Sequence, residues 1–432
     1  MLSRSRRGGP LAALACLGIA LAPSPAGAAA FALFEQGARG MGFAGAFTAQ
    51  ASDPSAIFHN AAGLGFLKGK QIYLGGTLIH PSTDFTGADP FPGAGRLEST
   101  DVGVTPTPSV YYSQRISERF VAGVGLDVPF GLKTEWASPE TFTGRFLSQK
   151  AELKGFSVNP TIAYKLADRL SIGAGLDVRI SSISLLRNVP FVNPFTQKVV
   201  DVASVDLSSG SHTALGWNLG ALAKPTESLS VGVSYREKVK QDYEGTATFT
   251  RIPTGNSQLD GLVAARLPAG AIAARTSIEV PSILSLGLAY ARSDWTVEGD
   301  VNFYKWSTFL TLPVTLEGHP ELSSVIEEDY HDSRQYRIGI ERQINDTWAV
   351  RGGYFYDESP SPPESMSPLL PDSGRHGFCL GGSWTQGRLR LDAGAWYVRL
   401  RARSTEGLQR DDYNGTYKGN AKTLGVSLGY AF

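Results

Sequence analysis

Apolar and polar residues alternate with a period of two along much of the chain beyond residue 70. Clear examples are residues 120–128 (FVAGVGLDV), 170–179 (LSIGAGLDVR) and 295–304 (WTVEGDVNFY). Because successive side chains of a strand point to opposite faces, each stretch predicts a strand with one apolar face and one face of small or charged residues. Segments of about ten such residues, separated by turn residues, are typical of a membrane-spanning β-barrel.

The chain ends on the same pattern, LGVSLGYAF (residues 424–432), with Phe432 on the apolar face. A soluble β-sandwich would also alternate, because one face of each strand then meets a second apolar sheet. Here the other face of the predicted strands mixes glycine, serine and charges of both signs, which suits a crowded, hydrated lumen. The pattern therefore favours a barrel with lipid outside and water inside over a sandwich.

Turn signals between the predicted strands are of two lengths. The very short connections lie at residues 117–119, 167–169, 225–228, 292–294, 344–346 and 386–388. The long connections lie at residues 82–103, 133–151, 188–206, 250–276, 310–332, 358–375 and 404–418. Six short turns and seven long loops predict an all-β, 14-stranded antiparallel transmembrane β-barrel with short periplasmic turns and long external loops. An even strand number closes the sheet and leaves no edge in lipid.

The first residues predict export. Arginines at positions 4, 6 and 7 precede an apolar run at residues 11–22, and small residues follow at 26–28. This order is typical of a signal peptide, predicted as residues 1–28, with cleavage after Ala28 or, as second choice, Ala30. The run is too short to span a bilayer as a helix. Export and the barrel pattern together predict the outer membrane of a Gram-negative bacterium.

Residues 29–70 are rich in glycine and show no sustained alternation. A barrel of fourteen strands is wide enough to need filling, so this stretch is predicted to form an N-terminal hatch that plugs the barrel of residues 71–432. Charged residues on the inward faces of the strands are predicted to hold the plug. They are Asp127, Asp177, Arg179, Arg236, Glu298, Asp300, Arg337, Glu341, Arg351 and Asp392.

Composition and motifs exclude several classes of function. The chain holds 40 basic and 40 acidic residues, so its zero net charge gives no reason to expect a nucleic-acid partner. Residues 40–45 match GxGxxG but follow no strand, which argues against a dinucleotide site. The six histidines have no metal-ligand spacing and none forms a convincing Ser-His-Asp triad. We therefore expect no catalytic residue, no metal and no cofactor.

Aromatic residues near the predicted strand ends are interpreted as belts at the two membrane interfaces, in contact with outer-membrane lipid. They are Tyr73, Trp295, Tyr354, Trp384, Trp396 and Tyr430. The terminal Phe432 resembles the C-terminal signal by which the assembly machinery recognises outer-membrane barrels.

Two N-terminal stretches, residues 37–46 (GARGMGFAGA) and 53–64 (DPSAIFHNAAGL), resemble the hatch of the FadL family of outer-membrane transporters for long-chain fatty acids and other hydrophobic compounds. The similarity continues in order through the mature chain, at residues 129–132, 216–220, 235–239, 306–307, 357–360 and 429–432. It implies a barrel of fourteen strands plugged by the hatch, in agreement with the independent count of turns and loops.

The resemblance also implies a route for the ligand. A hydrophobic molecule would be captured among the external loops, pass to a tighter pocket near the start of the hatch, and leave sideways where the third strand kinks inward. The kink would fall on Val128, Pro129, Phe130 and Gly131, the predicted lateral gate. Proline cannot donate to a ladder and glycine allows a bend. The alternative is that Pro129 merely ends the strand near the rim.

The residues expected to bind the ligand come from two places. An apolar N-terminal tail inside a wet lumen needs an apolar pocket, which points to Phe31, Leu33 and Phe34. The resemblance adds Arg187, where fatty-acid transporters carry an arginine facing the carboxylate, with Ile183 and Leu185 on the same strand face. The alternative for Arg187 is a rim charge in solvent.

The chain departs from the family pattern at two points. It has Pro313 where a basic residue is expected, and Asn60-Ala61-Ala62 in place of the hatch triplet Asn-Pro-Ala. Neutral aromatic or aliphatic hydrocarbons therefore stay open as ligands. A lipid-acting enzyme, a general porin and a structural barrel are the other classes, but no Ser-His pair is evident, and a plug would be out of place in an open pore. The protein is expected to act as a monomer.

Overall fold

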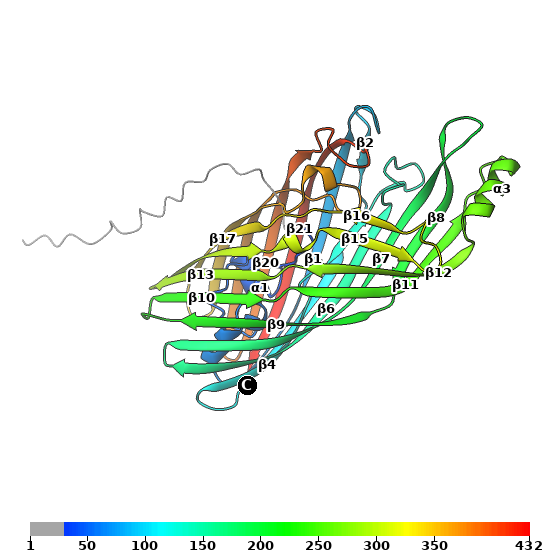
Figure 1. Ribbon diagram of the computed structural model, residues 1–432. Coiled ribbons are helices and arrows are strands. Elements are labelled where there is room, and N and C mark those ends of the chain that lie inside the picture. The colour runs from blue at the N-terminus through cyan, green and yellow to red at the C-terminus, as the bar shows by residue number, and fades with distance from the viewer. Residues whose placement is uncertain (1–29) are drawn as a thin grey trace, which may run out of the picture.

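Residues 30–432 are described by a computed structural model, and the predicted signal peptide, residues 1–28, lies outside them. Within this range, fourteen strands close into one antiparallel ring, and the last strand pairs back with the first (Figure 1). The predicted strand number and fold class are confirmed. In ring order the wall strands are β1 (Lys70–Gly87), β3 (Thr105–Arg115), β4 (Phe120–Asp127), β6 (Lys150–Ala167), β7 (Leu170–Val192), β9 (His212–Ala223), β10 (Leu229–Arg236), β13 (Ile283–Arg292), β14 (Trp295–Tyr304), β17 (Ser333–Gln343), β18 (Trp348–Asp357), β19 (Arg375–Gln386), β20 (Leu389–Ser404) and β21 (Gly415–Ala431).

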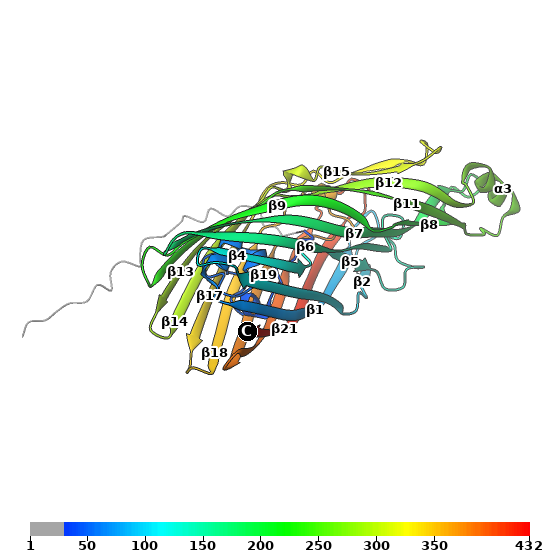
Figure 2. The same ribbon diagram turned by 90° about the horizontal axis from the view of Figure 1, so that it is seen from below.

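The six predicted short turns join consecutive wall strands, as between β13 and β14. The predicted long loops are partly wrong, because several of them continue as strands. β7 runs on to pair with β8 (Val199–Ser209), which pairs with β11 (Val239–Arg251) and so builds a sheet beyond the barrel mouth (Figure 2). The remaining elements outside the wall are β2 (Leu97–Ser99), β5 (Leu132–Glu135), α3 (Ser257–Arg266), β12 (Gly270–Val280), η2 (Trp306–Thr308), β15 (Thr311–Leu316), β16 (Ser324–Glu327) and η3 (Pro363–Ser365).

The two faces of the wall differ as the alternation predicts. On β21, Leu424 and Leu428 are exposed on the outside at 52% and 43%, whereas the side chain of Ser427 is buried in the lumen. The outer face is therefore the apolar surface that lipid requires. No helix within residues 30–432 combines the length and apolar character needed to cross a bilayer.

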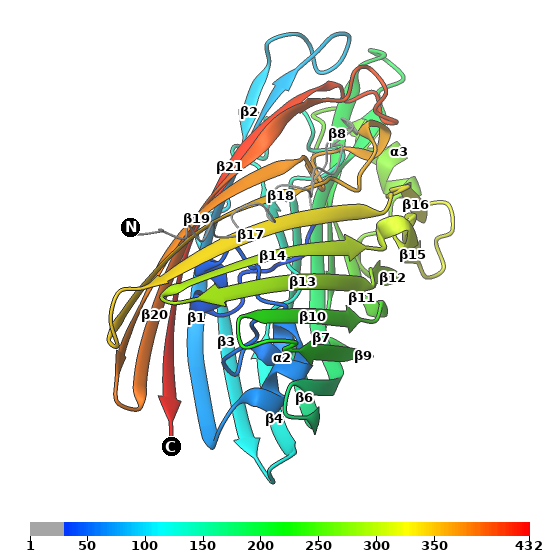
Figure 3. The ribbon, with the colours of Figure 1, turned by 90° about the vertical axis from the view of Figure 1, so that its left-hand side faces the viewer.

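Residues 30–69, here called the inner segment, lie inside the ring (Figure 3). They hold α1 (Ala38–Gly42), α2 (Ala56–His59) and η1 (Ala61–Phe66). The fit against the wall is close, because a Cβ on Gly339 would lie 2.6 Å from the carbonyl oxygen of Phe43. Glycines on the lumen face thus let two main chains approach each other.

The aromatic belt prediction is right for some residues and wrong for others. Trp295 and Tyr430 lie on the outer face. Tyr73 and Trp396 point into the lumen instead, where the Tyr73 hydroxyl donates to Asp392 at 3.0 Å and the Trp396 indole N–H donates to a main-chain carbonyl at 2.6 Å. Both lie on the inward parity of their strands, and this parity decides their direction.

Candidate functional site

The third wall strand is interrupted at the residues predicted as a gate. β4 pairs with β6 as far as Asp127, and pairing resumes with β5 at Leu132. Residues 128–131 leave the ladder between these two points. Pro129 has no N–H to donate, so a continuous strand here would lack one ladder bond in any case.

The first residues of the inner segment take the place of the missing strand partner. The Leu33 N–H donates to the Pro129 carbonyl at 2.9 Å, and the Gly131 N–H donates to the Phe31 carbonyl at 3.0 Å. The side-chain amide of Gln36 donates to the Val128 carbonyl at 2.7 Å. Three main-chain groups of the interruption therefore have their partners in residues 31–36, and a displacement of these residues removes all three bonds.

Phe31 forms part of the floor of an apolar cavity below the external sheet. Its ring meets Trp306 at 4.9 Å, Phe309 at 5.7 Å and Phe130 at 6.1 Å, measured between centroids and edge to face. The cavity has a free volume of about 90 Å³. Its lining also includes Leu153, Ile183, Leu185, Tyr243, Leu369 and Leu370.

Leu33 and Phe34 lie in a second, smaller space that also touches Phe58, His59 and Pro129. The predicted ligand-binding residues are thus divided between two spaces. Phe31, Ile183 and Leu185 share the larger one, and Leu33 and Phe34 share the smaller one.

Arg187 lies on the lumen parity of β7, opposite Val205 of β8, but it does not line the apolar cavity. The basic residue among the lining residues is Arg275, whose guanidinium lies 3.3 Å from the carboxylate of Glu244. The role of Arg187 as a carboxylate anchor stays a prediction.

Two carboxylates of β14 hold one turn of the inner segment. Asp300 accepts from the N–H groups of Phe47 and Thr48, both at 3.0 Å. Glu298 accepts from the Ala49 N–H at 2.5 Å. These bonds give buried main-chain N–H groups of the inner segment the acceptors that they would otherwise lack.

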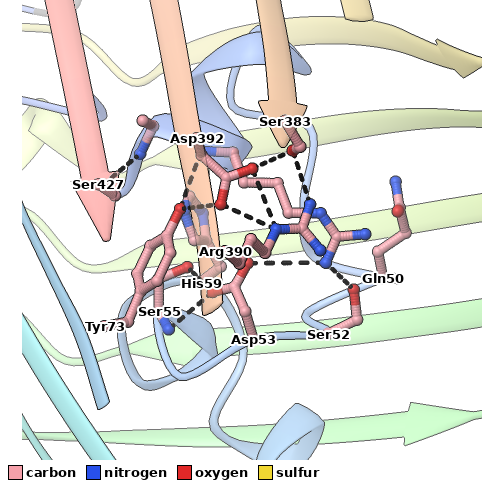
Figure 4. A network of polar contacts seen from close by, with 12 residues as sticks. Gln50, Ser52, Asp53, Ser55, His59, Tyr73, Ser383, Arg390, Asp392 and Ser427 are labelled. Carbon is pink, nitrogen blue, oxygen red and sulfur yellow. Dashed lines mark hydrogen bonds and ion pairs between the residues drawn. The ribbon is translucent and has the colours of Figure 1, made fainter. Parts of the chain in front are cut away.

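A second network joins the inner segment to β1 and β20 (Figure 4). Asp392 accepts from Tyr73 and lies 2.9 Å from the guanidinium of Arg390, while Arg39 of α1 pairs with Asp53 at 3.7 Å. Most of these groups are buried, so each charge has a partner of opposite sign or a hydrogen bond.

The predicted triplet Asn60-Ala61-Ala62 connects the inner segment to itself and to the wall. The Asn60 side-chain carbonyl accepts from the Ala62 N–H at 3.1 Å and so caps η1. Its amide donates to the carbonyls of Thr48 at 2.8 Å and Ala221 of β9 at 3.1 Å.

His59 ends α2 in the middle of the inner segment. Its Nε2 lies 3.0 Å from the Gln36 carbonyl, and its side chain is buried. Burial disfavours the charged imidazolium and lowers the pKa of His59 to about 4. His59 is therefore neutral at physiological pH and donates through Nε2.

Several cavity residues escaped prediction. Leu369 and Leu370 come from the long connection at residues 358–375, and Tyr243 comes from β11. Trp306 belongs to one of the stretches that resemble the family, residues 306–307. That resemblance singled out the residue but did not predict its contact with Phe31. Residues 30–432 contain no group of three His, Cys, Asp or Glu residues placed to hold a metal ion.

Residues 19–432 match the protein family described as Outer membrane protein transport protein (OMPP1/FadL/TodX). The chain belongs to this family. The OMPP1/FadL/TodX chain is 24% identical over 437 residues to a long-chain fatty acid transport protein of Escherichia coli O6:H1, with 96% of this chain and 97% of the relative covered. Its localisation is the outer membrane, as predicted.

Solved structures share the fold of the OMPP1/FadL/TodX chain. A Pseudomonas aeruginosa FadL homologue superposes with a TM-score of 0.82 at 19% identity, covering 94% of this chain and all of its own. The P. putida toluene transporter TodX superposes with a TM-score of 0.73 at 20% identity, covering 92% and 98%. The recognition of the family from the N-terminal motifs is confirmed, and the protein is an outer-membrane transport protein.

Proposed function

We propose that the protein is a non-enzymatic channel through which long-chain fatty acids or similar hydrophobic molecules enter by diffusion. The observation that carries the proposal is the position of Phe31. Its ring closes one side of the apolar cavity, and its carbonyl accepts from Gly131 in the interrupted strand. One residue therefore touches both the capture cavity and the gap in the wall.

The route follows from this connection. A ligand entering the cavity displaces Phe31, and movement of residues 31–36 withdraws the hydrogen-bond partners of residues 128–131. The inner segment then acts as the hatch of residues 29–70 within the barrel of residues 71–432. The ligand leaves sideways through the gap beside Pro129, and Phe432, 61% exposed at the free end of β21, fits recognition by the barrel-assembly machinery.

Uptake of neutral hydrocarbons is the second candidate. It is favoured by the lining of the cavity, which is almost wholly apolar and does not include Arg187. The basic residue of the lining, Arg275, is already paired with Glu244, so a carboxylate bound there would lose hydration with little compensation.

Ligand binding by the purified protein in detergent separates the two candidates. A long-chain fatty acid is compared with an alkane of equal length, using the wild type, Arg187→Ala and, as a control, Lys198→Ala at the tip of the β7–β8 hairpin. Preference for the acid that is lost only in Arg187→Ala supports fatty-acid uptake. Equal binding of both ligands in all three proteins supports hydrocarbon uptake, and absence of binding to either contradicts the proposed function.

A further inference from the structure

The outer wall of β19, β20 and β21 carries a group of basic side chains, here called the cationic patch. It consists of Arg399, Arg401, Lys418 and Lys422, with His376 beside them as a neutral polar group. Arg399 shares its strand parity with Tyr397, which is 47% exposed, and Lys422 shares its parity with Leu424, which is 52% exposed. Both basic residues therefore face outward, toward lipid, rather than into the lumen.

The register of the sheet places these side chains together. His376 lies opposite Arg399 on the neighbouring strand, and Lys422 lies opposite Tyr397. Paired strands are about 4.8 Å apart, so groups from three strands converge on one area. The Tyr354 hydroxyl and His376 Nδ1, 2.6 Å apart, add further polar groups at its edge.

The height of the patch matches the outer boundary of the membrane. Arg399 lies ten residues beyond Leu389, where β20 leaves its short turn. At about 3.3 Å per residue and a tilt of about 40°, this distance is about 25 Å along the barrel axis, which is the height of the apolar band of such barrels. Below the patch the wall is apolar, with Phe378 and Leu380 exposed at 56% and 71%.

Most of the patch has no acidic partner. In the described part of the chain, the side chains of Arg399, Arg401 and Lys422 form no ion pair, while Asp84 lies opposite Lys418 in the register. Some other basic residues of the outer wall are paired, as in Lys305–Asp332 at 2.5 Å and Arg342–Asp294 at 3.2 Å. The cationic patch is thus an uncompensated positive surface at the level of the lipid head groups.

We propose that the cationic patch binds the phosphate groups of a phosphorylated lipid of the outer leaflet, whose acyl chains lie along Phe378 and Leu380. Guanidinium and ammonium groups make charge-assisted bonds to phosphate oxygens, and arginine can do so with two N–H groups at once. The long side chains reach the head-group level while their stems stay on apolar surface. This lipid is a partner of the wall, separate from the transported molecule.

The test uses the full barrel in detergent and lipid A as the probe. The double variant Arg399→Gln/Lys422→Gln is compared with Arg119→Gln/Arg169→Gln, which removes the same charge from exposed positions at the opposite, short-turn end. Native mass spectrometry counts bound lipid A, dephosphorylated lipid A and, separately, inorganic phosphate. Neither double variant touches the inner segment.

We expect the wild type and the control variant to bind lipid A equally, and the patch variant to bind it at least fivefold more weakly. Dephosphorylated lipid A should bind all three proteins as weakly as lipid A binds the patch variant. Equal binding of lipid A by the patch variant and the control overturns the proposal. If the patch variant loses binding of inorganic phosphate to the same extent as binding of lipid A, the assignment to a lipid is contradicted.

Discussion

Leu33 donates its main-chain N–H to the carbonyl of Pro129 at 2.9 Å, so the inner segment occupies the place that a wall strand would otherwise fill. The carbonyl of Phe31, two residues earlier, accepts from the N–H of Gly131. The backbone of the interruption is held from inside the barrel rather than by its neighbours in the sheet.

Replacement of Leu33 by proline removes this donor. We expect Leu33→Pro to raise the hydrogen-exchange rate of the Gly131 N–H at least tenfold, because both bonds belong to the single antiparallel bridge between Ala32 and Phe130. Leu33→Ala keeps the N–H and serves as the control. Equal exchange in the two variants would show that the bridge does not depend on the Leu33 bond.

Phe31 can be truncated without replacing any residue of the wall. Phe31→Ala removes three edge-to-face contacts, each worth about 0.5–1.5 kcal/mol, together with part of the cavity lining. We expect ligand affinity to fall about tenfold, equivalent to about 1.4 kcal/mol, in calorimetric titration with whichever ligand binds the wild type better. Phe195→Ala, at an exposed hairpin tip, should bind normally. Unchanged affinity in Phe31→Ala would remove this residue from the ligand path.

Asp300 anchors the inner segment through two N–H groups. Both N–H groups donate to the same oxygen of Asp300, and Asp300→Asn can place its amide group there instead, at a cost of about 0.5–1.5 kcal/mol for each hydrogen bond lost. We expect faster proteolysis within residues 47–50 and a higher ion conductance in planar bilayers. Asp294→Asn, in the exposed turn before the same strand, changes the same charge away from the lumen. If both variants conduct alike, Asp300 does not hold the plug in place.

His59 makes the inner segment sensitive to acid. Its pKa is lowered to about 4 in the folded protein, whereas an unfolded histidine takes up a proton near pH 6.5. The stabilisation is therefore complete above pH 6.5 and is lost as the pH falls toward 4, by about 3 kcal/mol in all.

Hydrogen exchange of residues 36–59 between pH 7 and pH 4, corrected for intrinsic rates, measures this loss. We expect protection to fall over that range in the wild type. His59→Gln keeps an N–H donor but does not titrate, so its protection should stay level. A wild-type profile as flat as that of His59→Gln would rule out His59 as the source of acid sensitivity.

Much of the wall could be predicted because lipid outside and water inside impose a strict alternation. Where residue type was given more weight than alternation, the prediction was wrong, as for Tyr73 and Trp396. Strands beyond the barrel wall, such as β15 and β16, were predicted as loops, because a strand outside the lipid need not be apolar on one face. The interruption of the third wall strand after Asp127 was predictable from Pro129 itself.

The lining of the apolar cavity could be predicted only in part. Its lining comes from β6, β7, β11 and the loop that carries Leu369, and these segments are far apart in the sequence. Alternation tells which face a residue occupies, but not which distant segment packs over that face. Arg187 illustrates this limit, since its lumen-facing parity was correct and yet it lies outside the cavity lining.

The inner segment touches the wall at positions far along the chain. The N–H of Ala38 donates to Ser427, 389 residues away, and the carbonyl of Met41 accepts from Trp396, 355 residues away. These contacts cannot form until β20 and β21 are in place and the ring has closed on β1. The inner segment precedes the whole wall in the sequence, and yet its native contacts with β20 and β21 can form only after the last strands of the ring.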